Sequence, residues 1–99
     1  MRYTFESCAT KYNVAICQLN SGILVTYFNE GLAGTSIYLV PNGSHSCIYI
    51  AEKMGLSLQD AVNIMAFVCQ KFPGSGLVDE FDLQHWMHAR YSDPNRAIA

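Results

Sequence analysis

The stretch from residue 12 to residue 40 constrains the fold of this chain more than any other. It contains three runs rich in strand-forming residues, KYNVAICQ, ILVTYFN and TSIYLV. Breaks that contain Gly and Asn separate these runs at residues 20–22 and 30–34. Because Val, Ile, Tyr, Phe and Thr favour strands while Gly and Asn favour turns, the stretch predicts an antiparallel β-meander. Residues 2–6 can add a short first strand.

Alternation along these strands predicts two faces of the sheet. The expected core face carries Tyr3, Phe5, Val14, Ile16, Leu24, Phe28, Ile37 and Leu39. The expected open face carries Glu6, Asn13, Cys17, Val25, Tyr27, Asn29 and Tyr38. An open face that mixes aromatic residues with amides and an acid is either ordinary solvated sheet surface or a binding face.

After residue 43 the spacing of apolar residues changes from that of a strand to that of a helix. We expect a first helix over residues 44–54 with Gly55 as its C-cap, a second from Ser57 to about residue 72, and a third over residues 79–91. Residues 44–50 would also serve as a fifth strand. The prediction is an α+β fold in a single domain of residues 1–99. It has a four-stranded antiparallel meander (residues 2–40), two to three helices packed on one face (residues 44–91) and a frayed tail (residues 92–99).

The composition narrows the classes of partner. Only 14% of the residues are charged, against a typical value of about 25%, and 51% are hydrophobic. A sparsely charged small domain has apolar surface to cover, so a protein partner or a second copy is expected. The net charge is −2 and no basic run exists, which disfavours binding along a phosphate backbone. No run of apolar residues is long enough to cross a membrane.

The four cysteines, Cys8, Cys17, Cys47 and Cys69, form no Cys-x-x-Cys pair. The first residues lack the apolar segment of a signal peptide. We therefore expect reduced thiols in a cytoplasmic protein, with disulfides as the alternative.

No set of residues forms a complete catalytic or metal-binding pattern. His85 and His88 lie three positions apart on the third predicted helix, but two histidines are half of a zinc site. His45 and Cys47 would share a face only on a strand, and a thiol enzyme is the alternative that this spacing leaves open. We expect a protein that is not an enzyme and holds no metal or cofactor.

Two further candidates have structural explanations. The acidic cluster Asp79, Glu80 and Asp82 suits the first turn of a helix, where carboxylates interact favourably with the dipole. The segment Pro73-Gly74-Ser75-Gly76 has the glycines of a phosphate-binding loop, but no Lys follows it and no strand precedes it. It predicts a loop between helices.

The segment TSIYLVPNGSHSCIYIAEKMGLSLQDAVNIMAFVCQKF, residues 35–72, resembles ribbon-helix-helix antitoxins. That family runs strand, helix, Gly-Leu-Ser/Thr and helix, and the Gly55-Leu56-Ser57 step matches it. In the family the strand pairs with its twin in a dimer and reads the DNA major groove. The resemblance therefore implies a small DNA-binding regulator. A helical hairpin without a DNA role is the alternative, because Ile37, Tyr38 and Leu39 are poor readers of bases.

A second resemblance concerns MRYTFESCATKYNVAICQLNSGILVTYFNEG together with FPGSGL at residues 72–77. This layout is similar to small phage anti-CRISPR proteins that combine a four-stranded sheet with helices. Such an inhibitor lays tyrosines and a glutamate of its open sheet face on a type I surveillance complex and blocks target DNA. This chain departs from the family in its extra helix at residues 44–54, and Cys17 falls near the place of one binding tyrosine.

The resemblance implies a non-enzymatic phage inhibitor that acts in the cytoplasm of a bacterial host on a type I CRISPR-Cas complex. It implies no direct contact with nucleic acid, and a homodimer is possible. Alternation on the open face, or position at its turn, selects the expected partner-binding residues: Glu6, Tyr27, Asn29, Glu30 and Tyr38. The alternatives are the ribbon-helix-helix regulator and an immunity-type interaction module.

Overall fold

The computed structural model describes residues 1–28 and 34–92, the last three of these as backbone only. Its elements are β1 (Arg2–Ser7), β2 (Thr10–Leu19), β3 (Gly22–Tyr27), β4 (Thr35–Leu39), α1 (Cys47–Met54), α2 (Leu58–Lys71) and α3 (Glu80–Ser92). The four strands pair antiparallel in the order β1-β2-β3-β4. The predicted α+β fold with a four-stranded meander is therefore confirmed.

Tight turns set the register of the sheet. Ser7 pairs with Thr10 around the two residues Cys8 and Ala9, which have φ values of 52° and 64°. Two successive residues with positive φ match the twist of a hairpin and usually require Asn or Gly. The next turn also has two residues, because Leu19 pairs with Gly22.

Local capping determines where the helices begin and end. Ser46 and Ser57 accept hydrogen bonds at the N-termini of α1 and α2, and Gly55 ends α1 with a φ of 66°. The predicted cap at Ser57 and the predicted stop at Gly55 are therefore confirmed. The first helix starts at Cys47 rather than at residue 44. Of the residues 44–50 that were the alternative for a fifth strand, the last four belong to this helix, while His45 forms an isolated bridge with Val78.

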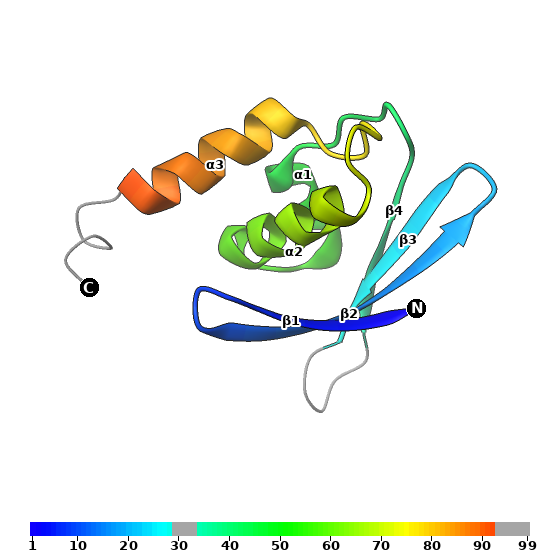
Figure 1. Cartoon of the computed structure of the whole chain (residues 1–99), viewed down its shortest axis with the longest axis horizontal. Helices are drawn as coiled ribbons and strands as arrows, with labels where there is room; N and C mark the ends of the chain where they lie inside the picture. The colour runs from blue at the N-terminus through cyan, green and yellow to red at the C-terminus, as the bar shows by residue number, and fades with distance from the viewer. Residues whose placement is uncertain (29–33, 93–99) are drawn as a thin grey trace.

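The helices lie on one side of the sheet, with α1 and α2 against it and α3 beyond α2 (Figure 1). Ring stacking joins β1 to α2. The ring centres of Phe5 and Phe67 lie 4.2 Å apart, and the planes of the two rings make an angle of 3°. Tyr3 meets the same Phe67 ring edge-on at 5.4 Å. The core lies between sheet and helices and includes Val14, Ile16, Ile37, Leu39, Ile50, Met54, Ile64, Met65 and Val68.

The predicted orientation of β3 is wrong. Val25 and Tyr27 are buried in the core, whereas Leu24 and Phe28 are only half-buried on the opposite face. The register explains the reversal, because Val14 stands opposite Tyr27 and residues directly opposite in a ladder share a face. Since Val14 points to the helices, Tyr27 must do so too, and it is only 8% exposed.

No helix among the described residues is long and apolar enough to cross a membrane. The predicted tail starts at residue 92, but Ser92 is still the last residue of α3. The rest of the predicted tail, residues 93–99, lies outside the described part of the chain.

Candidate functional site

The sheet face that points away from the helices is the candidate site. Within the described residues no helix or strand packs over it (Figure 1). Its side chains are exposed or half-buried: Arg2, Thr4, Glu6, Lys11, Asn13, Ala15, Cys17, Leu24, Thr26, Phe28, Ser36 and Tyr38. We call this set the open face.

Contacts between neighbouring side chains order the open face. Three hydrogen bonds cross from strand to strand or from strand to turn: Thr4 to Asn13 (2.9 Å), Thr26 to Ser36 (2.8 Å) and Ser21 to Tyr38 (2.5 Å). The guanidinium of Arg2 lies 4.2 Å from the centre of the Phe28 ring. A binding surface whose side chains are already held loses less conformational entropy on association.

The expected partner-binding residues do not form one compact cluster. Glu6 and Tyr38 both lie on the open face and are exposed. They stand on the two edge strands, and the strand register places them about 25 Å apart. Tyr27 is buried on the other face, so its assignment to the site is wrong. Asn29 and Glu30 lie outside the described residues.

Sequence reasoning missed Leu24 and Phe28, which place apolar surface on the open face. Both phases of the run ILVTYFN contain large apolar residues, so alternation alone does not orient this strand. A two-residue turn at Asn20-Ser21 fixes the register of the two strands and places Val25 opposite Ile16. Because Ile16 belongs to the core face, this register would have assigned Val25 to the core face as well.

The thiol of Cys47 is buried and has the environment of a protonated thiol. Burial, with the nearby Asp82 carboxylate as the next cause, raises the pKa of Cys47 to about 12. Burial also raises the pKa of Cys69, with Glu80 adding to the effect. Because the thiolate is the reactive form, neither group has the lowered pKa of a catalytic cysteine. The imidazole of His45 stacks on Tyr49, 5.4 Å away.

Two of the three acidic residues near the start of α3, Asp79 and Asp82, act as caps. Asp79 Oδ1 accepts the backbone N–H of Asp82 at 3.1 Å. Asp82 in turn accepts the backbone N–H of Cys47 at 2.8 Å and the indole N–H of Trp86 at 3.2 Å. The Asp82 carboxylate therefore joins the start of α1 to α3.

Other candidate sites also have structural roles or lack ligands. Among the described residues, no group of three or more His, Cys, Asp or Glu side chains could hold a metal ion. Backbone hydrogen bonds pin the loop at residues 73–76 against the turn after β4, from Asn42 to Ser75 and from Ser44 to Gly76. The loop between α2 and α3 is thus held against the connection between β4 and α1.

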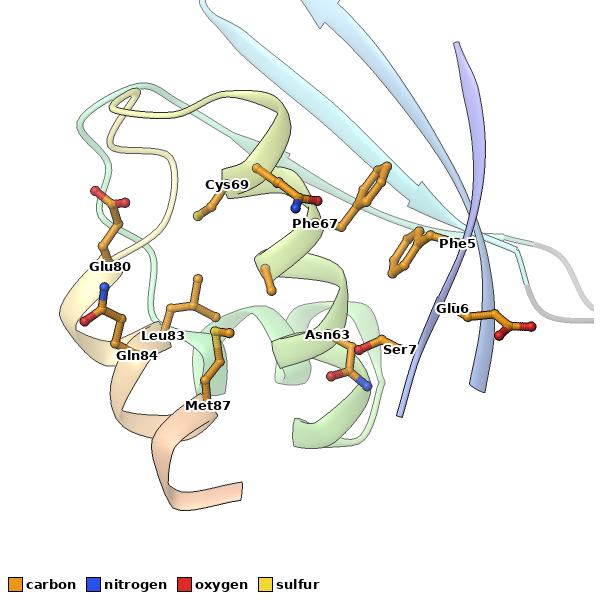
Figure 2. A pocket seen from close by; sticks show the side chains of 12 residues that line it. Phe5, Glu6, Ser7, Asn63, Phe67, Cys69, Glu80, Leu83, Gln84 and Met87 are labelled. Carbon is orange, nitrogen blue, oxygen red and sulfur yellow. The ribbon is translucent and has the colours of Figure 1, made fainter. Parts of the chain in front are cut away.

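A groove of about 490 Å³ lies between β1, α2 and α3. Figure 2 shows Phe5 and Phe67 on one side and Leu83 and Met87 on the other, while the Glu6 side chain points away from it. Its walls are mainly apolar, and it opens beside the outer edge of β1.

The strand that resembles the antitoxin ribbon is part of this sheet. Residues of β4 pair with β3 of the same chain, from Ile23 opposite Leu39 to Tyr27 opposite Thr35. One edge of the strand is therefore already occupied, and Ile37 and Leu39 point into the core.

Comparisons with protein-family models, with curated proteins and with solved structures find no match to this chain.

Proposed function

We propose that this chain is a non-enzymatic inhibitor that binds a protein partner through its open face. The observation that carries the proposal is an ordered sheet face over which no described element packs, with the exposed Tyr38 beside the half-buried Leu24. Aromatic and apolar groups among ordered polar ones are typical of protein interfaces.

The dimensions of the open face favour a protein over a small molecule. A span of about 25 Å between Glu6 and Tyr38 is comparable to a standard protein interface of about 800 Å² per partner. Small ligands prefer concave pockets, and the open face is the outer surface of a sheet. The charge on this face is mixed, with Arg2 and Glu6 on β1 and Lys11 opposite Glu6 on β2.

In its most specific form, the proposal is a phage anti-CRISPR protein that binds a type I surveillance complex and blocks target DNA. The similarity of the strand region and of the FPGSGL loop to that family supports this form. A compact chain of net charge −2 also suits a groove built to hold nucleic acid, because opposite charge aids encounter.

Phage plating tests the proposal. The chain is expressed in bacterial hosts that carry different active type I systems, and each host is challenged with a targeted phage and with an untargeted one. We expect plaques of the targeted phage to return in at least one host, with no change for the untargeted phage. Absence of restoration in every host would contradict the anti-CRISPR form.

A binding titration with duplex DNA separates this proposal from a DNA-binding regulator. An inhibitor of the proposed kind should leave naked duplex unbound at all salt concentrations. A regulator would bind as a dimer, with an affinity that falls steeply as salt rises. Such binding would contradict the inhibitor proposal.

A further inference from the structure

The outer edge of β1 carries backbone groups that no strand of the described chain pairs with. β1 is the first strand in the sheet order, so only β2 lies beside it. Met1 exchanges two hydrogen bonds of 2.9 Å with Ile16 of β2. Because bonding alternates along an antiparallel strand, Tyr3 and Phe5 also point their backbone groups at β2. Those of Arg2, Thr4 and Glu6 therefore point outward.

The side chains of the outward-pointing residues are self-complementary. If two copies of β1 align antiparallel about Thr4, Arg2 of each copy stands opposite Glu6 of the other. Thr4 then meets Thr4 on the same face. Opposite charges and paired threonines are both stabilising cross-strand partners. In this register every outward-pointing residue meets another outward-pointing residue, as an antiparallel ladder requires.

On the other face of β1, the same register pairs the aromatic side chains of the two copies. Tyr3 of each copy stands opposite Phe5 of the other, and aromatic cross-strand pairs are among the favourable ones. Phe5 lines the groove that opens beside this edge (Figure 2). The second copy's Tyr3 would lie at the mouth of the groove, next to apolar surface that includes Phe67.

The edge at β4 has no such complementarity. Its strand, TSIYL, contains no charged residue, so electrostatics would not select an antiparallel partner or fix a register. Charges on an edge strand usually protect a sheet from association. On β1 the two charges have opposite sign and are placed symmetrically about Thr4. For a second copy of the same chain they therefore attract rather than repel, so they favour association instead of preventing it.

We propose that this chain forms a two-fold homodimer through antiparallel pairing of β1 with β1, giving a continuous eight-stranded sheet. The contact is small, so its Kd should be about 100 µM, at the weak end of specific association. The inference does not depend on the proposed inhibitor function, since the pairing uses the edge of β1 rather than the centre of the open face.

Sedimentation equilibrium of the chain over a range of concentrations tests the dimer. We expect the mean mass to rise from that of one chain toward that of two, without larger species. A one-chain mass at concentrations up to about 1 mM, well above the expected Kd, would overturn the proposal.

Charge reversal tests the register. Glu6→Arg places two arginines opposite each other, and Arg2→Glu places two glutamates opposite each other. Each single variant should raise the Kd of the dimer about tenfold or more, because both symmetry-related pairs change from attractive to repulsive. The double variant Arg2→Glu/Glu6→Arg restores opposite charges and should return the Kd to within about threefold of the original.

The double variant also controls for effects within one chain. Glu6 stands opposite Lys11 on β2, and Arg2 stacks on Phe28, and the double variant loses both of these contacts. Recovery of the dimer in the double variant is therefore specific to pairing between copies. A dimer that survives the single reversals, or that the double variant fails to restore, would overturn the proposed register.

Thr4→Pro is an independent test. The N–H of Thr4 points outward, so proline removes no backbone hydrogen bond to β2. It does remove the exposed hydrogen bond from the Thr4 hydroxyl to Asn13, and Thr4→Val, which lacks that bond but keeps the N–H, is the matched control. We expect the circular dichroism spectrum of the folded chain to persist and the dimer to be lost. A proline variant that is folded and still dimeric would place the contact elsewhere.

Discussion

The hydroxyl of Tyr12 on β2 donates a hydrogen bond of 2.6 Å to Asp60 Oδ1 of α2, across 48 positions of the sequence. The same hydroxyl accepts a hydrogen bond of 2.9 Å from the side-chain amide of Asn63, one helical turn further on. Tyr12 is fully buried and Asn63 nearly so. This polar contact joins β2 to α2 on the side of the sheet opposite the open face.

Removing the Tyr12 hydroxyl should destabilise the fold. Tyr12→Phe keeps the ring but takes away a donor to Asp60 and an acceptor for Asn63. We expect the free energy of unfolding to fall by about 1–3 kcal/mol in urea titrations. Tyr38→Phe is the matched control, because its hydroxyl bonds Ser21 at the surface, and it should change stability by less than about 0.5 kcal/mol. Equal effects would contradict the role of Tyr12.

Stability should fall in alkaline solution. Burial and the hydrogen bond to Asp60 raise the pKa of Tyr12 from 10.0 to about 12, and burial with Asp82 raises that of Cys47 from 9.0 to about 12. In the unfolded chain both groups lose their protons at lower pH than in the folded chain, so folding is penalised as pH rises.

Urea midpoints measured from pH 8 to pH 12 check this dependence. The midpoint should begin to fall near pH 9 and should fall further between pH 10 and pH 12. In Tyr12→Phe the decline above pH 10 should be shallower. A decline identical to that of the original chain would contradict the raised pKa of Tyr12.

The four thiols should divide into two classes on alkylation. Cys8 and Cys17 are exposed, whereas Cys47 is buried and Cys69 partly so, each of the latter two with a raised pKa. In the native chain, iodoacetamide at pH 8 should modify Cys8 and Cys17 first, as peptide mass spectrometry would show. In urea all four should react at similar rates. Preferential modification of Cys47 in the native chain would instead support a thiol enzyme.

The Asp82 carboxylate should contribute more to stability than its neighbour in the same helical turn. It accepts hydrogen bonds from the N-terminus of α1 and from Trp86. We expect Asp82→Ala to lower the free energy of unfolding by about 1–2 kcal/mol and to change the fluorescence of Trp86. Glu80→Ala changes an exposed acid that is the first residue of α3, and it should have an effect below about 0.5 kcal/mol.

Much of the fold follows from local sequence. Strand-forming runs, the capping Ser57 and the left-handed Gly55 act within a few residues, and they predicted the meander and the helices after it. The orientation of β3 was not predicted, because both Val25 and Leu24 offer an apolar face. Only the register relative to β2 decides which of the two points inward.

The candidate site was predicted in part for the same reason. Glu6 and Tyr38 lie on strands where only one phase is strongly apolar, and both are on the open face. Tyr27 was misplaced together with the rest of β3. The contact between Tyr12 and Asp60 left no local signal, because its partners are far apart in the sequence and each has an ordinary role within its own element.

A plating assay with matched variants tests the role of the open face most directly. Cys17→Arg adds bulk and charge at an exposed position of the face, opposite Leu24 and in the same row as Tyr38, and Tyr38→Ala removes the most exposed ring of the face. Tyr49→Ala is the control, because Tyr49 is 41% exposed, against 39% for Tyr38, but lies on α1. In a host where the original chain restores plaques of a targeted phage, we expect Tyr49→Ala to restore them fully and the two open-face variants to fail while remaining folded. No restoration by the original chain in any type I host, or equal restoration by all the variants, would contradict the account.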